Sequence, residues 1–347
     1  MINDISSPNG SLLLNSTLKN TKRDIFTPRA NYKPFEYPEI LQFVNTINQT
    51  YWVHTELDYT SDQQDYFVSL SPLEKSAIQN SLLAISQIEV AVKQFWGKLY
   101  KYLPKPELLG LGSTFAECEF RHSEAYSRLL DVINANDAFA NIMEVPQIKN
   151  RVNFLSTYLK KKVNKEDKRG YALSLVIFSL FIENTSLFSQ FAIILSFTRF
   201  KSLLKNTSNV IAWTSKDEQI HAASGIFLFN TIIAENPELF DDEMKDTIIT
   251  AAKKAIEVEE DILNWIFEKG ELEFCSKESL LYFMKDRINS SLKSIGIRKV
   301  FIIPPEKLKP MFWFDEEIKA TTHDDFFAKR PTEYSKFNKI INEDNLF

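Results

Sequence analysis

The chain has few of the residues that break or redirect a polypeptide. Among its 347 residues are only 8 glycines and 13 prolines. This shortage argues against a turn-rich β fold and favours a small number of long elements. Cysteine is also scarce, because Cys118 and Cys275 supply neither a disulfide framework nor a CxxC metal motif. We therefore expect a protein that works in a reduced, cytoplasmic setting.

Charge and targeting signals exclude further classes of protein. The formal net charge is −5 and the basic residues form no stripe, so we expect no nucleic-acid partner. The first residues, MINDISSPNGSLLLNS, lack the basic start and the long apolar run of a signal peptide. No secretory leader is expected.

One apolar run could be either a membrane-spanning helix or a buried core helix. Residues 172–197 are long enough to span a bilayer, but Glu183, Asn184 and Gln190 interrupt them. A carboxylate at the centre of a bilayer costs roughly 2.5–3.5 kcal/mol. The run is therefore predicted to be a buried core helix, and no membrane partner is expected.

The chain is rich in bulky apolar side chains, including 28 phenylalanines, and in helix signals. Ser71, Pro72 and Glu74 supply a cap, a first-turn proline and a capping-box acid in succession. Helices are predicted over these ranges: 71 to about 103, from the PKPELLGLGS turn to about 134, 172–197, from about 209 after a turn at 206–209, beyond a cap at 236–238, and 276–296. The predicted fold class is therefore all-α.

Three segments are expected along the chain. Residues 1–30 are rich in Ser, Asn, Thr and Lys without a sustained period, and are predicted to be flexible. Residues 31–320 contain the helical domain. Residues 321–347 are polar and irregular, and are predicted to form a flexible C-terminal tail.

Two of the four histidines follow a glutamate by three residues. The pairs are Glu119 with His122, in ECEFRH, and Glu218 with His221, in DEQIH. On a helix this spacing places both side chains on one face. A single pair of this kind is more often a surface ion pair, so the interpretation depends on further partners.

Two more glutamates supply those partners. Glu89 lies fifteen residues before Pro104 and Glu119 lies fifteen residues after it, so an antiparallel hairpin would bring both acids to the same height. Glu183 lies inside the most apolar predicted helix. Its spacing relative to Glu218 is less symmetric, and an extra short helix or a kink after Glu183 would absorb the difference.

These side chains together match a known pattern of metal ligands. One glutamate from each of two helices and one Glu-x-x-His from each of two others is typical of ferritin-like di-iron and dimanganese carboxylate proteins. Four carboxylates in an apolar bundle would repel one another unless cations neutralise them. Oxygen-rich ligation with one imidazole per ion suits iron or manganese better than zinc or copper. The sequence thus predicts a ferritin-like helical bundle with a carboxylate-bridged dimetal site.

A metal pair of this kind could store iron, insert oxygen into a substrate or generate a radical. Tyr126 lies one turn past His122 and favours the third activity, because a phenol near an oxidising metal pair can lose an electron and a proton. A tyrosine at this spacing is, by itself, more often a core residue. Leu187 and Phe191, four and eight residues past Glu183, are candidates for excluding water from the site.

The chain resembles the radical-generating small (β) subunit of class I ribonucleotide reductase over residues 31–347. The resemblance rests on YWVHTELDYTSD, IEVAVK, FAECEFRHSEAYS, FIENTSLFSQF and SKDEQIH. It implies a homodimer that makes deoxyribonucleotides only together with a separate large (α) subunit. It also implies a path for electrons and protons from the metals through His122 and Asp217 to Trp52. The implied metal ligands are Glu89, Glu119, His122, Glu183, Glu218 and His221.

The end of the chain resembles the tail by which the family's small subunit docks on the large subunit. This segment reads DFFAKRPTEYSKFNKIINEDNLF and covers residues 325–347. A tail tyrosine relays the radical in the family, and Tyr334 is the only tyrosine after Tyr282. The resemblance therefore assigns the relay role to Tyr334.

One departure from the family pattern concerns the first ligand. Many members have an aspartate where this chain has Glu89. A glutamate there, beside a retained Tyr126, is most similar to the dimanganese subclass Id, in which a Mn(III)/Mn(IV) pair activated by superoxide holds the oxidising equivalent. By that resemblance, Tyr126 need not store the radical. Two iron ions or a mixed manganese–iron pair are the alternatives, because the ligand preferences of the two metals overlap.

Two other functions use the same scaffold. A ligand-binding oxidase would act alone on an apolar substrate, and a ferritin-like store would only hold metal. The tail and Tyr334 favour the reductase subunit, since an oxidase has no use for them.

Overall fold

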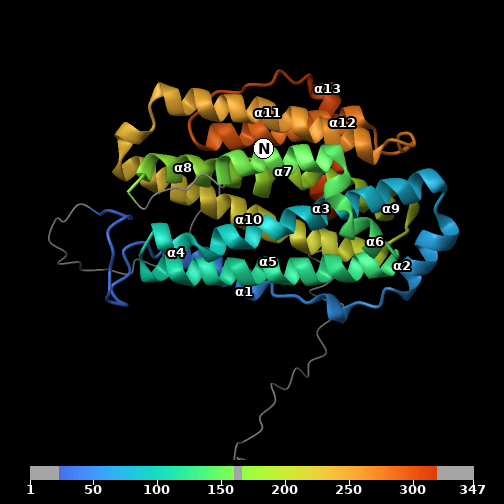
Figure 1. Ribbon diagram of the computed structural model, residues 1–347, viewed down its shortest axis with the longest axis horizontal. Helices are drawn as coiled ribbons and strands as arrows, with labels where there is room; N and C mark the ends of the chain where they lie inside the picture. Colours follow the sequence, from blue (N-terminus) through green and yellow to red (C-terminus); the bar gives the residue numbers. More distant parts are fainter. Residues whose placement is uncertain (1–22, 160–165, 319–347) are drawn as a thin grey trace, which may run out of the picture.

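The computed structural model describes residues 23–159 and 166–318, whose helices lie side by side along one long axis (Figure 1). In these two ranges there is no strand, and an isolated bridge joins Leu272 to Cys275. The α-helices are α1 (Ile40–Gln49), α2 (Thr60–Gln64), α3 (Pro72–Gly97), α4 (Leu99–Tyr102), α5 (Pro106–Val132), α6 (Asn136–Ala140), α7 (Pro146–Leu159), α8 (Lys168–Ile177), α9 (Phe188–Lys201), α10 (Lys205–Glu235), α11 (Asp242–Ile266), α12 (Lys277–Ser294) and α13 (Pro305–Leu308). Two π-helices, η2 (Asp65–Ser69) and η4 (Phe178–Ser186), and the short 3₁₀ segments η1 (His54–Glu56), η3 (Ile142–Glu144), η5 (Pro237–Leu239) and η6 (Lys309–Met311) complete the set. The predicted all-α class is confirmed.

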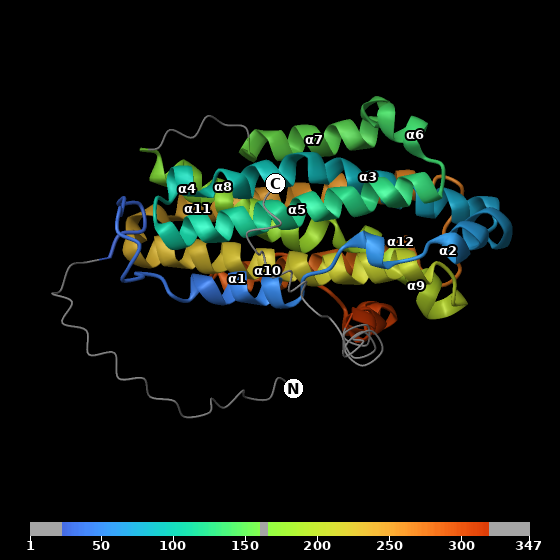
Figure 2. The same ribbon diagram turned by 90° about the horizontal axis from the view of Figure 1, so that it is seen from below.

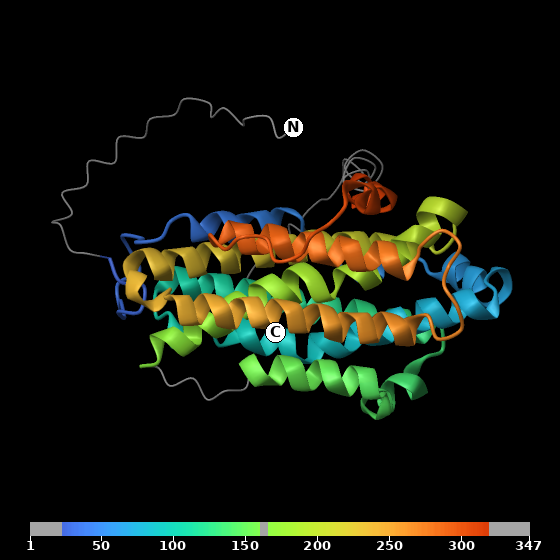
Figure 3. The same cartoon turned by 90° about the horizontal axis from the view of Figure 1, so that it is seen from above.

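The centre of the bundle is formed by α3, α5, α10 and the run α8–η4–α9. Helices α3 and α5 pack along most of their length as the predicted hairpin (Figure 2). Helix α1 packs on α5 and α10 at one face of the bundle, while α11 and α12 lie along the opposite face (Figure 3). Elements on both faces thus shield the central helices from solvent.

The predicted ends of the first two long helices need small corrections. The helix from residue 71 has the expected capping box, with Glu74 N donating to Ser71 Oγ and Ser71 N to a Glu74 carboxylate oxygen. It is interrupted at Lys98, which separates α3 from α4. The PKPELLGLGS segment is helical from Pro106 onwards rather than a turn throughout, because Pro106 occupies the first helical position, where a missing N–H costs nothing.

The start of α10 differs from the prediction. The turn falls at residues 202–204 rather than 206–209, with Ser202 and Leu204 in the left-handed region at φ 56° and 57°. The helix begins at Lys205 because carboxylates from a distant segment cap it. Asp62 accepts from the main-chain N–H groups of residues 206 and 207, and Asp65 accepts from that of Leu204.

Of the two later helix caps predicted, the one at 236–238 is wrong and the one at Ser276 is confirmed. Asn236 does not cap a helix, because a 3₁₀ turn follows it and the side chain of Asp241 caps α11 through Met244 N. Ser276 caps α12, as predicted, and Gly296 follows the helix with a φ of 79°.

The apolar run forms three consecutive elements, α8, η4 and α9. Lys168–Lys201 is long and apolar enough to cross a membrane, but 89% of its most apolar window is buried inside the bundle. Glu183 lies in the π-helical part, and the run changes back to α-helix after Leu187. The expected irregularity was an extra short helix or a kink after Glu183, whereas the structure has a π-helix that contains Glu183.

An N-terminal strap, residues 23–39, is held against α5 and α10 by two carboxylates. Glu107 accepts from the main-chain N–H groups of Glu36 and Tyr37 at 3.0 and 3.1 Å, and it pairs with Arg29. Glu235 accepts from Ile25 N and from the Tyr37 hydroxyl at 2.7 and 2.8 Å.

The strap corrects the predicted boundary of the flexible N-terminal segment. Residues 23–30 pack on the bundle, and Ile25 is fully buried. Residues 1–22 and 319–347 lie outside the described residues, so flexibility there stays a prediction.

Glu107→Ala should lower the free energy of unfolding by about 3 kcal/mol, because it removes the buried carboxylate partner of Arg29, which keeps only the more exposed Glu36, and leaves two strap N–H groups without an acceptor. Urea unfolding of the full-length protein measures the change. Glu257→Ala is the control, because its exposed pair with Lys254 contributes little to stability. Equal effects of the two variants would contradict the anchoring role of Glu107.

Candidate metal centre

Six buried side chains converge at the centre of the bundle. Within the described residues, one ligand atom each from Glu89, Glu119, His122 and Glu218 lie within 4.8 Å of one another, and so do those from Glu119, Glu183, Glu218 and His221. The two groups share Glu119 and Glu218. Two overlapping groups with two shared carboxylates are the arrangement expected for a pair of bridged ions.

The two imidazoles turn the same ring nitrogen towards the shared glutamates. His122 Nδ1 lies 3.2 Å from a Glu119 oxygen and 3.1 Å from a Glu218 oxygen. His221 Nδ1 lies 2.8 Å from the other Glu119 oxygen and 3.4 Å from the other Glu218 oxygen. The Glu-x-x-His spacing on α5 and α10 produces this approximate symmetry, because each pair lies on one face of its helix.

Burial makes the carboxylate cluster electrostatically unstable by itself. Glu89 is 2% exposed and the other five side chains are fully buried. Burial raises the pKa of Glu89, and the neighbouring charge of Glu119 raises it further. Burial likewise raises the pKa of Glu183, with the charge of Glu218 adding to the effect. In the absence of cations these acids take up protons.

The hydrogen bonding of the cluster fits a metal pair. Despite the short separations from the imidazoles, both oxygens of Glu89 and of Glu218, one oxygen of Glu119 and of Glu183, and both ring nitrogens of His221 are buried and make no hydrogen bond of acceptable geometry. Buried polar atoms in proteins are almost always paired. Carboxylate oxygens with one imidazole for each ion form a donor set that suits manganese or iron.

The outer nitrogen of His122 continues into a second layer of contacts. His122 Nε2 lies 3.2 Å from Asp217 Oδ2, and Trp52 Nε1 donates to the same oxygen at 2.9 Å. The Trp52 ring also stacks on the imidazole, with ring centroids 5.8 Å apart. The structure therefore brings together the three residues of the path that the sequence resemblance implied.

Three of the remaining predicted residues are buried in the bundle, and the fourth lies outside the described residues. Tyr126 is buried one turn past His122, and its pKa is raised by burial and then by the charge of Glu89. Leu187 and Phe191 are fully buried on the Glu183 run. Tyr334 lies outside the described residues.

Two contacts to this centre were not predicted from the sequence. Trp96 donates to Glu183 Oε1 at 2.8 Å, and Cys118 donates to Asp217 Oδ2 at 3.4 Å. Helical periodicity counted from the predicted ligands indicates both residues. Trp96 lies seven residues past Glu89, two turns along the same face, and Cys118 lies four residues before His122.

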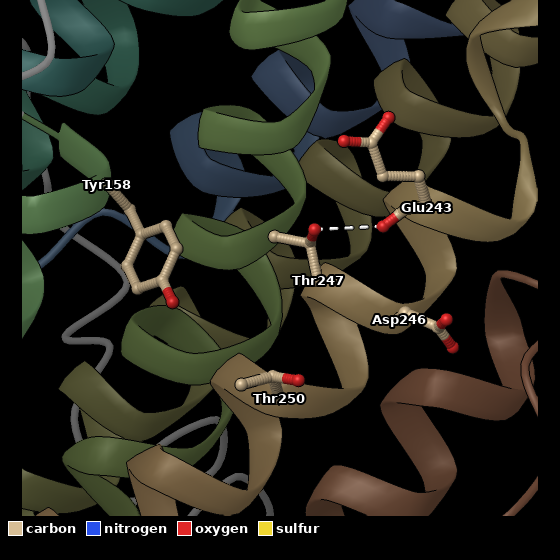
Figure 4. Close-up of a pocket in the computed structure, with 5 residues that line it drawn as sticks. All are labelled: Tyr158, Glu243, Asp246, Thr247 and Thr250. Atoms are coloured by element: carbon tan, nitrogen blue, oxygen red, sulfur yellow. Dashed lines mark hydrogen bonds between the residues drawn. The ribbon is translucent and has the colours of Figure 1, made fainter.

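A surface pocket between α7 and α11 is a separate feature. It is lined by Tyr158, Glu243, Asp246, Thr247 and Thr250, and the Thr247 hydroxyl donates to the main-chain oxygen of Glu243 (Figure 4). None of these residues belongs to the buried cluster. The candidate functional site is therefore the buried cluster.

A helical bundle that buries two Glu-x-x-His pairs and two further glutamates defines a class, the ferritin-like carboxylate proteins built for a pair of metal ions. The family model for the ribonucleotide reductase small chain matches residues 29–310. The chain belongs to this family.

Individual relatives agree with this assignment. The probable ribonucleoside-diphosphate reductase small subunit 048L of Invertebrate iridescent virus 3 is 26% identical over 90% of this chain and 86% of its own length. A putative class I ribonucleotide reductase from Bacillus halodurans has a TM-score of 0.74 and 20% identity, covering 81% of this chain and 99% of that one. The dimanganese(II)-NrdF of Streptococcus sanguinis has a TM-score of 0.70 and 16% identity, covering 85% and 99%.

The family assignment confirms the expected activity. The protein is a small subunit of class I ribonucleoside-diphosphate reductase, an oxidoreductase. The oxidase that acts alone is not favoured.

Manganese(II) binding should release protons and weaken as the pH falls. Burial raises the pKa of Glu89 and Glu183 in the metal-free protein, so an incoming ion displaces protons there, and a lower pH favours the protonated form. Calorimetry in buffers of different ionisation enthalpy measures the proton count.

The matched variants are Glu89→Gln and Glu259→Gln. The first should reduce both the affinity and the proton release. The second removes a buried acid on α11 whose pKa is also raised by burial but which lies outside the cluster, and it should change neither. An affinity that stays constant from acidic to neutral pH would contradict the ligand set.

Proposed function

We propose that this subunit holds a dimanganese cofactor and supplies the oxidising equivalent that the large subunit uses to make deoxyribonucleotides. The support is the pair of overlapping ligand groups that share Glu119 and Glu218. The proposed ligands are Glu89, Glu119, His122, Glu183, Glu218 and His221. A bound manganese pair would supply a one-electron oxidant, as Mn(III)/Mn(IV) in its active form.

Asp217 orients the His122 imidazole for ligation. Its Oδ2 lies 3.2 Å from His122 Nε2, so this nitrogen carries the proton and Nδ1 keeps its lone pair on the side of the shared glutamates. A carboxylate on the outer nitrogen also makes the imidazole a stronger ligand.

Trp52 is the proposed exit for the oxidising equivalent. An indole that loses an electron becomes acidic at its N–H group, and Asp217 Oδ2, at 2.9 Å from Trp52 Nε1, is in position to accept that proton. Arg121 donates to the main-chain oxygen of Trp52 at 3.1 Å and holds the residue in place. The indole is 5% exposed, which limits the access of water to the oxidised ring.

Manganese is proposed over iron because Glu89 occupies the first-ligand position beside a retained Tyr126, as in the subclass Id resemblance. In this proposal the metal pair, rather than Tyr126, holds the resting oxidising equivalent. Two iron ions or a mixed pair would fit the same donors.

The proposed partners are the large subunit and a second copy of this chain. Residues 325–347 are the proposed docking tail, with Tyr334 as the relay to the large subunit. This tail lies outside the described residues.

Trp52→Phe should lower deoxyribonucleotide formation with the large subunit by about 100-fold or more, without changing the metal content. The ring remains to stack on His122, but no N–H group can pass a proton to Asp217. Deletion of residues 325–347 should likewise abolish deoxyribonucleotide formation and leave the metal content unchanged, because docking and relay are lost while the metal site stays intact.

Tyr51→Phe is the control for this experiment. Tyr51 is the exposed neighbour of Trp52, and its hydroxyl bonds to Glu117. Its loss should leave activity near the parent value. Full activity of Trp52→Phe would rule out the proposed path.

Protein purified from its native host should contain two manganese ions per chain and show a many-line manganese signal in electron paramagnetic resonance. The electron spin of a mixed-valent manganese pair couples to two manganese nuclear spins, and this hyperfine coupling splits the signal into many lines. Elemental analysis of the same sample supplies the metal content. An iron-loaded protein with a tyrosyl doublet would instead assign radical storage to Tyr126 and overturn the manganese proposal.

A further inference from the structure

The two terminal carboxylates of the cluster differ in their hydrogen bonding. Neither oxygen of Glu89 has a hydrogen-bond partner. Glu183 Oε1 accepts from Trp96 Nε1 at 2.8 Å, whereas Glu183 Oε2 has no partner and lies 3.8 Å from His221 Nδ1. Glu89 thus has two oxygens available for a cation, and Glu183 has one.

The Trp96 indole is fixed in place by its surroundings. It is fully buried, and the rings of Phe115 and Phe178 meet it edge-on, with centroids 4.9 and 5.5 Å away. Side chains packed on several sides leave an indole little freedom to change rotamer.

Two glycines allow the helices around Trp96 to approach closely. A Cβ at Gly112 on α5 would lie 2.7 Å from the Trp96 main-chain oxygen, so a larger residue would force α3 and α5 apart. A Cβ at Gly225 on α10 would lie 3.7 Å from the far end of the indole, and 1.8 Å from Ser179 Oγ. The close approach of these helices therefore depends on glycine where Trp96 packs.

Glu183 requires an external restraint more than the other acids do. It lies in the π-helix η4, whereas the other five proposed ligands lie in regular α-helices. On the outer side of the same segment, Arg287 donates to both the main-chain and side-chain oxygens of the next residue, Asn184. Trp96 on the inner side and Arg287 on the outer side therefore hold the irregular segment.

We infer that Trp96 is a positioning residue of the metal centre, which engages Glu183 Oε1 so that Glu183 offers only Oε2 to its ion. An ion held with His221 would then have one protein oxygen fewer available to it than an ion held with His122. The two positions would be unequal in the number of oxygens that the protein offers. This inference rests on the proposed metal site and adds a second tryptophan with a role separate from that of Trp52.

The first test is a crystal structure of the full-length protein loaded with manganese(II). The expected result is Glu183 bonded to its ion through Oε2 alone, with Oε1 still on Trp96. Ligation of the same ion by both Glu183 oxygens would overturn the inference while leaving the proposed function intact. A protein that binds neither manganese nor iron at these residues would overturn the proposed function itself.

The second test replaces the hydrogen-bond donor. Trp96→Phe, or replacement of Trp96 by its sulfur isostere benzothienylalanine, removes the N–H group, and the isostere keeps the shape of the ring. Calorimetric titration with manganese(II) should show one ion bound about 10-fold more weakly, because Glu183 loses the bond that fixes its orientation, and the other within about twofold of the parent. The electron paramagnetic resonance spectrum of the manganese-loaded variant should also differ from that of the parent protein.

Phe178→Leu is the matched control, because it alters the packing on Trp96 and keeps the N–H group. It should leave both affinities and the spectrum close to those of the parent protein. If Phe178→Leu reproduces the change, or if the benzothienylalanine protein titrates like the parent, Trp96 acts only through packing and the inference is wrong.

Discussion

The structure is organised around four carboxylates and two imidazoles buried in an apolar interior. Each carboxylate loses its hydration, and each is close to another negative charge, so the cluster is tolerable only when protons or cations compensate. No helix supplies more than one carboxylate and one imidazole of the set. The ligands therefore meet only when four separate elements are packed correctly. A site with such strict requirements links the fold of the bundle to the binding of its ions.

Local periodicity made most of this centre predictable from sequence. The Glu-x-x-His pairs fix two imidazoles and two carboxylates on helix faces, and the equal distances of Glu89 and Glu119 from Pro104 fix their relative height in a hairpin. What escaped prediction depends on contacts between segments far apart in the chain. The start of α10 is set by Asp62 and Asp65, and nothing in the sequence near residue 205 reports those carboxylates.

The irregular η4 segment also depends on contacts with residues that are distant in the sequence. Helix propensity alone would continue the apolar run through Glu183 as a regular helix. The π-helix moves the register of this segment, a distortion often found where a side chain must reach a functional position. Its cost is offset by contacts from other helices, namely the indole of Trp96 and the guanidinium of Arg287. Because those partners lie about 90 and 100 residues away, a sequence window around Glu183 predicts an extra short helix or a kink but cannot give the form of the irregularity.

The two tryptophans give the two halves of the centre different surroundings. On the His122 side, Asp217 Oδ2 receives the N–H group of Trp52 and the thiol of Cys118, so contacts lead outward from the imidazole. On the His221 side, both ring nitrogens lack a hydrogen-bond partner, and Trp96 bonds to the carboxylate beside the imidazole. An approximately symmetric set of ligands therefore has an asymmetric set of outer partners. The two tryptophans therefore act on different ligands, because Trp52 reaches His122 through Asp217, whereas Trp96 bonds directly to the carboxylate of Glu183. A change to either indole is expected to affect one half of the centre more than the other.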